Sequence, residues 1–561
     1  MLLSPLAAQA APDPALLARA RSALERRDFP AALPLYAQLV AADPADADLL
    51  IEAARAQGFA DRNADAARLY RQALGAAPAR RADILPSLAW QTLWAGDAMA
   101  ALHLFDELAR TRTDSAGRAD ALDGAGQAQQ ALGHLGAASE SYTQALALRP
   151  GDRRLEMRLA LVLLWQDRHA EAIARLRALQ AQAPGDRDIG WALANALNFA
   201  GRHREALREF DRWGAPRNAG ERMDLARAWH WAGDDERAAA LLAGATDADA
   251  RWLRDWRVAR ESKPYLYGSI DSARDRDGLE VTAASLAAGW RRDARLLYEV
   301  QARHVALRDP NGAPSGQQWQ GLVRWRLGDV EDGAGVWLPS LALRANRYDG
   351  WNFVSGTAHA VWLPRDGLRV DADAARDPIE TPLAVARRIT VDAVSLGADW
   401  KPDARWSATG ALATLHFSDA NTRQRVNGRA DYAITLRPRW VVGVDAMSFT
   451  ASNPTRATHA GNGYWNPRRY DEARAYTALV VEQRPFEFSA RLAFGASREV
   501  DGDGNASHGR PHQWELALDA DAAPGLRLRL AAGASGSGFG LAGGGAGYWR
   551  RYASLSLIGW F

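Results

Sequence analysis

The chain of 561 residues contains no cysteine. This absence excludes a disulfide framework, cysteine-based metal sites, a thiol nucleophile and a lipid-modified N-terminal cysteine. Long hydrophobic runs are missing as well, because no segment approaches the roughly 18 uninterrupted apolar residues of a membrane helix. If this chain crosses a bilayer, it does not do so on helices.

Charge of one sign and catalytic signatures are also absent. The net charge is +2, without the block of basic residues that indicates a nucleic-acid partner. The histidines form no His-Glu-x-x-His, there is no Gly-x-Ser-x-Gly, and the glycine run at 540–548 lacks the Lys-Ser/Thr of a phosphate loop. We therefore predict a protein that is not an enzyme, uses no metal or cofactor and binds no nucleic acid.

The N-terminal stretch has features of an export signal. A short apolar segment is followed by Ala8, Gln9 and Ala10, the small-x-small pattern that signal peptidase accepts. Because the basic leader is missing and the apolar segment is short, we interpret residues 1–10 as a truncated signal peptide whose true start lies upstream. The start of an alanine-rich helix is the alternative.

The first half of the chain repeats. Pro44 and Pro78 are 34 residues apart, and so are Pro150 and Pro184, with small and large residues in register before them. Each unit reads as a helical pair, in which a small residue allows close approach of the helices and proline ends the second helix. We count about seven units between Ala11 and Gly244.

This repeat resembles the tetratricopeptide repeat (TPR) family. Residues 120–150 match its pattern best, with Gly126, Ala138, Tyr142 and Pro150 in place. The resemblance predicts an α-helical TPR solenoid over residues 11–262. A repeat array offers a concave surface that binds a protein or peptide, and a passive spacer is the alternative.

After Pro264 the apolar period changes from 3.6 to 2. We count sixteen candidate strands, mostly ~10–14 residues long, which is enough for a tilted strand to cross a bilayer. Short turns alternate with longer loops, as do the periplasmic turns and external loops of outer-membrane barrels. The predicted fold class is therefore α + β multidomain, with the TPR solenoid followed by a 16-stranded antiparallel transmembrane β-barrel over residues 263–561. A soluble sandwich is the alternative.

The barrel prediction also concerns its last strand. An even strand number places both ends of the barrel chain on one side, which must be the periplasm because the repeats are attached there. A closed barrel has no edge, so the last strand pairs with the first, and Leu555, Leu557 and Phe561 fall on the lipid face. A C-terminal aromatic residue there resembles the signal read by the outer-membrane barrel-assembly machinery, so we assign this role to Phe561.

Sixteen strands enclose an aqueous lumen, and its polar wall is the predicted substrate-binding surface. The predicted lining residues are Asp371, Asp373, Arg369, Glu299, Arg303, Asp431, Glu487, Arg491, Glu515, Asp519, Asp521, Arg527 and Arg529. Carboxylates and guanidinium groups together can hydrogen-bond sugar hydroxyls and amides along a polymer. The acidic pairs Asp371 with Asp373 and Asp519 with Asp521 would favour a partly cationic polymer. Alternatively, these charges only hold the cross-section open.

One loop, residues 461–470, is unusually aromatic. Its glycines permit a tight return of the chain, and Tyr464, Trp465 and Tyr470 offer ring faces in what we predict to be an external loop. Two roles remain open, stacking on a sugar ring and anchoring at the membrane surface.

TPR repeats running directly into a sixteen-stranded barrel resemble the outer-membrane exporters of bacterial exopolysaccharides, namely the poly-β-1,6-N-acetylglucosamine export porin and the barrel of the cellulose-secretion protein C. The resemblance implies export of a biofilm polysaccharide across the outer membrane of a Gram-negative bacterium, with periplasmic repeats that dock polymer-processing proteins. An outer-membrane receptor, adhesion or structural barrel with a protein-binding TPR domain is the alternative. We expect a monomer, because a single chain closes the barrel.

Overall fold

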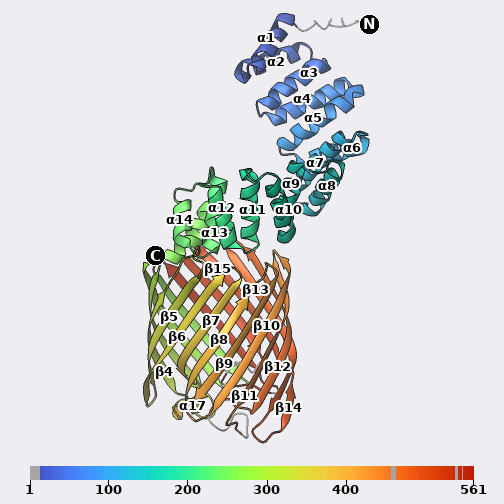
Figure 1. Ribbon diagram of the computed structural model, residues 1–561. Helices are drawn as coiled ribbons and strands as arrows, with labels where there is room; N and C mark the ends of the chain where they lie inside the picture. Colours follow the sequence, from blue (N-terminus) through green and yellow to red (C-terminus); the bar gives the residue numbers. More distant parts are fainter. Residues whose placement is uncertain (1–12, 456–462, 537–540, 542, 546) are drawn as a thin grey trace, which may run out of the picture. The chain divides into compact units, whose positions relative to one another are not determined.

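The computed structural model describes residues 13–455, 463–536, 541, 543–545 and 547–561 (Figure 1). The predicted signal peptide, residues 1–10, lies outside the described residues. Packing divides the chain into two compact units between Ala196 and Leu197. None of the helices described is both long and apolar enough to span a membrane.

The first unit is a succession of helices of similar length. They are α1 (Pro14–Glu25), α2 (Phe29–Ala42), α3 (Ala47–Phe59), α4 (Asn63–Ala76), α5 (Arg81–Trp94), α6 (Ala98–Thr111), α7 (Ser115–Ala131), α8 (Leu135–Leu148), α9 (Arg153–Trp165), α10 (His169–Gln182) and, across the division, α11 (Arg187–Phe199), with a short 3-10 helix at Pro78–Arg80. Aspartates cap several helices, since Asp28 and Asp97 accept bonds from the backbone N–H groups of Ala31 and Ala100. The predicted repeat of helical pairs is confirmed.

The repeat signature acts through close packing of small against large residues. Ala138 and Tyr142 are buried in α8. A Cβ atom added at Gly126 would lie 2.6 Å from the ring of Tyr142, and one at Gly124 would lie 2.2 Å from the ring of Phe105. Glycine in α7 is therefore required because an aromatic ring of a neighbouring helix occupies the space of a side chain.

Replacing Gly124 with alanine should lower the free energy of unfolding by about 1–3 kcal/mol, because the new methyl group overlaps Phe105 in a packed core. Gly75 is the matched control, since a Cβ there meets nothing within 4 Å, and Gly75→Ala should stabilise the helix by up to about 1 kcal/mol. Urea unfolding of the full chain, followed by the helical circular dichroism signal, measures both. Equal effects of the two substitutions would contradict this packing account.

The second unit begins with the remaining helices and continues into the sheet. These helices are α12 (His203–Arg212), α13 (Ala219–Trp231), α14 (Asp235–Leu242), α15 (Ala248–Leu253), a π-helical turn (Arg254–Val258) and α16 (Ala259–Ser262). Together, α1 to α14 correspond to the seven predicted helical pairs. Helix gives way to strand between Ser262 and Tyr265, close to the predicted domain boundary, but packing groups the last helices with the strands.

The strands form one antiparallel sheet (Figure 1). They are β1 (Tyr265–Asp275), β2 (Glu280–Asp293), β3 (Leu296–Arg308), β4 (Ser315–Trp325), β5 (Val336–Tyr348), β6 (Trp351–Arg365), β7 (Leu368–Pro378), β8 (Thr390–Trp400), β9 (Trp406–Phe417), β10 (Thr422–Leu436), β11 (Arg439–Ala451), β12 (Arg469–Gln483), β13 (Phe486–Val500), β14 (Ala506–Gly509), β15 (His512–Ala523), β16 (Leu526–Ser535) and β17 (Arg550–Trp560). The short β14 and β15 both pair with β13 and share one position in the sheet, so the described strands fill sixteen positions.

The last strand pairs with the first, which closes the barrel. The register of β1 and β17 runs from Tyr265 opposite Trp560 to Asp275 opposite Arg550. Large apolar side chains such as Leu343, Val354 and Phe494 are exposed and alternate with inward polar positions, as expected for a lipid-facing surface. The predicted sixteen-stranded barrel is confirmed.

The helices of the second unit bind the strand connections at one end of the barrel. The backbone N–H of Arg204 donates to Asp366 Oδ2 at 2.8 Å, and the Arg204 guanidinium donates to the carbonyl oxygens of Leu363 and Pro364. Arg260 donates to Asp521 at 2.6 Å. We call this the helix-side end, and the opposite end, where α17 (Pro382–Ala386) lies in Figure 1, the far end.

Connection lengths differ between the two ends. The helix-side end carries the short turns 366–367, 437–438, 484–485 and 524–525. The far end carries the long connections 379–389, 452–468 and 536–549, and also the two-residue turn 349–350. The predicted asymmetry is therefore present, with the connection 326–335 as a longer helix-side segment. Arg237 of α14 pairs with Asp329 and Glu331 in that segment, which gives its length a structural role.

A buried histidine in α12 should make the stability of the second unit pH-dependent. His203 Nδ1 lies 2.8 Å from Asn198 Oδ1, and burial lowers the pKa of His203 to about 4. The unfolded chain binds a proton near pH 6.5, so the contribution of neutral His203 is present above that pH and is lost as the pH falls towards 4. Thermal unfolding between pH 4 and 8 should therefore lose less on acidification in His203→Gln than in the unchanged chain. Parallel curves would contradict this.

Candidate functional site in the barrel lumen

The predicted lining residues lie on the inward face of the strands. In β7, Asp371 and Asp373 flank the exposed Ala372, so the two carboxylates point away from the lipid-facing side. The same alternation places the other members of the set opposite exposed apolar side chains such as Phe488, Leu516 and Leu530. The interior wall is thus polar, with both signs of charge.

Most charges of this wall are paired with each other. Ion pairs join Arg303 to Glu380, Arg369 to Asp371, Arg491 to Asp445, Arg527 and Arg529 to Asp519, and Arg527 to Glu487, while the hydroxyls of Tyr265, Tyr476 and Tyr552 donate to Glu299, Asp431 and Glu515. Positive and negative side chains therefore largely compensate each other on this wall, which is not a predominantly acidic lining.

The prediction that Asp519 and Asp521 together favour a partly cationic polymer is wrong, because arginine side chains bind both carboxylates. Arg527 Nε and Arg529 Nη1 donate to Asp519 at 3.1 and 2.9 Å, and Arg260 of α16 donates to Asp521. Both carboxylates are buried. Sequence periodicity placed them correctly on the inward face, but it contains no information on which cations lie opposite.

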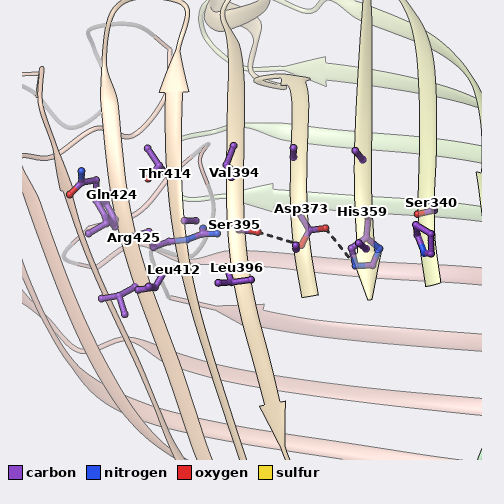
Figure 2. Close-up of a pocket in the computed structure, with 18 of the residues that line it drawn as sticks. Ser340, His359, Asp373, Val394, Ser395, Leu396, Leu412, Thr414, Gln424 and Arg425 are labelled. Carbon is purple, nitrogen blue, oxygen red and sulfur yellow. Dashed lines mark hydrogen bonds and ion pairs between the residues drawn. The ribbon is translucent and has the colours of Figure 1, made fainter. Parts of the chain in front are cut away.

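In the other predicted acidic pair, Asp371 with Asp373, the side chain of Asp373 remains accessible. His359 Nε2 lies 3.2 Å from Asp371 and 3.7 Å from Asp373, and Ser395 Oγ lies 3.4 Å from Asp373. Figure 2 shows this row on neighbouring strands. The pocket drawn there is lined mainly by apolar side chains such as Leu396 and belongs to the lipid-facing side of the wall, so it is not a polar ligand site.

At the far end, the connection 379–389 is folded against the wall. Ile379, Ala384 and Val385 are buried there. Glu380 accepts hydrogen bonds from Arg303, at 2.9 Å for Nη2, and from the hydroxyl of Tyr348 at 3.0 Å. This segment therefore narrows the barrel from the inside.

The ion pair sets the ionisation of Glu380. Burial alone would raise its pKa, but the hydrogen bonds and charge of Arg303 hold the pKa of Glu380 below its usual value. The carboxylate therefore stays charged, and the segment stays bound, over the physiological pH range.

We call the ion pair of Arg303 with Glu380 the clamp. Next to it lies a polar cavity of about 440 Å³. Its polar lining comprises Gln301, Arg303, Gln318, Gln320, Arg344, Asp377, Glu380 and Arg550. Arg344 Nη1 donates to Asp377 at 2.6 Å, and its Nε and Nη2 donate to Gln320 Oε1. The amides and guanidinium groups are suited to bind hydroxyl and carbonyl oxygens.

The predicted external role of the aromatic loop is wrong. Tyr464, Trp465 and Tyr470 are 1%, 0% and 0% exposed, so none presents a free ring face to a sugar or to the membrane surface. The guanidinium of Arg423 lies 4.2 Å from the ring centroid of Phe449 and donates to the carbonyl oxygen of Trp465.

The inward turn of this loop has a physical cause. The ring of Tyr464 stacks on Phe417 at 4.5 Å, and its hydroxyl contacts Asp419 at 2.9 Å, so the loop is drawn into the far end by aromatic packing and hydrogen bonds. Residues 461 and 462 lie outside the described residues.

Glu380, Arg344 and Asp377 were not among the predicted site residues. Asp377 lies in β7 on the same face as Asp371 and Asp373, so alternation places it inward, whereas Glu380 lies in a loop, where alternation gives no inward or outward assignment. The apolar residues of the segment 379–386, which are unusual in an exposed loop, are the signal that could have indicated an inward fold.

Fold and site together define a class: a membrane β-barrel of the outer-membrane type, with a polar lumen and preceded by TPR-like helical repeats. Residues 312–484, from the connection before β4 to the turn after β12, match the family model "PgaA membrane beta barrel domain". The resemblance of the chain to exopolysaccharide exporters with repeats before a barrel is thereby confirmed.

Several solved structures are also similar to this chain. A bacterial polysaccharide outer membrane secretin has a TM-score of 0.42 at 12% identity, covering 54% of this chain and 99% of its own. A tetratricopeptide repeat protein from Parabacteroides merdae has a TM-score of 0.38 at 16% identity, covering 43% of this chain and 96% of its own. At such low TM-scores, these structures support no statement about what the chain binds. Comparison with curated protein sequences finds no match.

Proposed function

We propose that this chain is an outer-membrane export channel for a biofilm exopolysaccharide of the poly-N-acetylglucosamine type. The carrying observation is the match to the PgaA membrane beta barrel domain on a closed barrel with a polar, charge-paired lumen. A wall of paired charges and amides offers many weak hydrogen-bonding positions and no single trap, which suits the passage of a long chain of sugars. The protein is in this proposal a conduit without catalytic activity.

The same proposal assigns an orientation. The helix-side end faces the periplasm, where the TPR repeats dock polymer-processing proteins, and the far end faces outward. The chain inserts as a monomer, and Phe561, whose side chain is exposed beside the β1–β17 seam, serves as the signal for the barrel-assembly machinery.

The absence of cysteine provides a test in cells. Gln320→Cys places one thiol in the lumen cavity, and a bulky hydrophilic maleimide bound there should stop secretion of the polysaccharide. Gln317→Cys, on the exposed outward side of the same strand, is the control and should leave secretion unchanged. Secretion that continues when Gln320→Cys is fully labelled, as quantified by mass, would contradict export through this lumen and favour a receptor or structural barrel.

A further inference from the structure

The outer surface of the barrel carries a row of charged residues at the far end, where β17, β1, β2 and β3 are neighbours. Arg551 of β17 is the register partner of Arg274 of β1. Glu280 of β2 is the partner of both Arg274 and Arg308 of β3. Arg274 lies on the same strand face as the exposed Ile270, so the row points towards lipid and not into the lumen. We call these four charged residues the arginine row.

The positive charge of the arginine row exceeds its negative charge. Arg274 Nη1 lies 3.4 Å from Glu280 Oε1, and among the described residues Arg551 and Arg308 have no ion-pair partner. The guanidinium of Arg551 lies 4.9 Å from the ring centroid of Trp549 instead. Like charges directly opposite each other in a sheet are destabilising, so Arg551 beside Arg274 is unfavourable unless an anion lies between them.

Two other outward arginines at this end of the barrel are paired with acids. Arg376 of β7 lies 2.6 Å from Asp392, and Arg469 of β12 lies 2.8 Å from Asp471. An outward arginine at this end therefore does not by itself provide a free positive charge. The paired arginines serve as matched controls for the arginine row.

An apolar groove of about 550 Å³ begins beside the two opposed arginines. Ser272 and Ala553 are register partners that line the groove and follow Arg274 and Arg551 on the same outward face, two residues or roughly 7 Å nearer the middle of the strands. Ala532 of β16 continues this row of small side chains. The larger lining side chains are those of Ile270, Phe488, Leu516, Leu518, Leu530 and Leu555. Because the small side chains protrude less than these neighbours, the wall is hollowed next to the charged row.

The two features together select the chemistry of an occupant. Guanidinium groups bind phosphate oxygens through paired N–H donors. The arginines stand at the strand ends, where the apolar surface of a barrel meets the lipid headgroups. A soluble polyanion would meet the arginines but leave the groove empty, whereas a lipid with a phosphate headgroup supplies both the anion and a hydrocarbon chain.

From this pattern we propose that the arginine row and the groove bind one phosphorylated lipid of the surrounding membrane. Its phosphate lies between Arg274 and Arg551, and one acyl chain lies in the groove. Arg308, two strands or roughly 10 Å from Arg274, is a further cationic position for a lipid with a second phosphate group. With the far end facing outward, as in the proposed function, this lipid belongs to the outer leaflet. The binding itself does not depend on export of a polymer.

The test is native mass spectrometry of the full chain in an uncharged detergent, titrated with lipid A that carries two phosphate groups. The unchanged chain should retain one lipid A molecule. The double variant Arg274→Gln and Arg551→Gln should weaken this binding about tenfold or more, because the charge-assisted hydrogen bonds to the phosphate are lost. The paired control, Arg376→Gln with Asp392→Asn, should leave the binding unchanged.

A second variant and two further probes test the lipid part of the proposal. Ala553→Trp fills the groove, removes no charge and should weaken the binding of lipid A several-fold. Phosphatidylcholine, which has acyl chains but no net charge, should not displace lipid A, and neither should inorganic phosphate at the same concentration. Heat-modifiable mobility in gels confirms that each variant is folded.

Three results would overturn the proposal. They are binding of lipid A that folded Arg274→Gln with Arg551→Gln leaves unchanged, displacement by phosphatidylcholine as effective as by lipid A itself, and displacement by inorganic phosphate with no effect of Ala553→Trp. None of these results concerns passage of a polymer, so the proposed export function stands or falls separately.

Discussion

Removal of the inward segment at the far end should raise the open-pore conductance several-fold. The segment 379–389 is held against the wall by the ion pair of Glu380 with Arg303 and by the hydrogen bond that the Tyr348 hydroxyl donates to Glu380. Replacing residues 379–389 by a two-residue Asn-Gly turn joins β7 directly to β8 and leaves the barrel closed, because these strands already pair along their length. Single-channel recording of the full chain in a planar bilayer measures the result.

A smaller change tests the clamp alone. The double variant Arg303→Ala and Glu380→Ala removes both charges together, so no unpaired buried charge remains, and the open fraction of the channel should rise. Arg376→Ala with Asp392→Ala is the matched control, because that pair lies on the exposed face at 2.6 Å and joins β7 to β8, the two strands that the segment connects. Conductance that stays unchanged when the segment is deleted would show that it does not restrict the pore.

Loss of Arg260 should destabilise the second unit by about 3–5 kcal/mol, the cost of leaving one member of a buried ion pair without its partner. Arg260 is 6% exposed, donates to Asp521 and to the carbonyl oxygens of Ala523 and Pro524, and lies 4.5 Å from the ring centroid of Trp560. It therefore connects α16 to the turn between β15 and β16 and to the closing strand. Arg260→Met keeps much of the side-chain volume and removes these bonds.

The control for this prediction is an exposed ion pair. Arg274 and Glu280 pair at 3.4 Å between β1 and β2 with both side chains exposed, so Arg274→Met should cost less than about 1 kcal/mol. Urea unfolding of the full chain in lipid vesicles, followed by the loss of heat-modifiable mobility in gels, compares the two variants. Similar midpoints for both would contradict the role assigned to Arg260.

The period-two alternation of the sequence was sufficient to predict which residues of the barrel wall point inward and which point outward. Alternation in β16 places Arg527 and Arg529 inward and Leu528 outward whatever else the chain does, because a one-residue slip would bury charge in lipid. The same holds for closure, since the backbone N–H and C=O groups along the free edge of β17 would be unsatisfied in lipid without β1 beside them. These are local properties, and a single sequence contains them.

The ion pair of Arg303 with Glu380 and the packing of Trp465 against Phe449 depend on long-range contacts, which periodicity does not encode. Arg303 and Glu380 are 77 residues apart, and Arg260 and Asp521 are 261 apart. Trp465 was predicted outside because its segment was taken as a long external loop, but Trp465 is buried against Arg423 and Phe449 on neighbouring strands. Which loops turn inward is decided by such pairs.

The most direct test of the central claim, that a polysaccharide passes through this lumen, is the dwell time of single blocking events when oligosaccharides of increasing length are added on one side of a bilayer that holds the full chain. Passage through the pore predicts dwell times that lengthen with the number of sugar units and shorten as the driving force across the membrane increases. Dwell times independent of length, or block that strengthens with driving force at every length, would show binding at one end without transport and would contradict the export function.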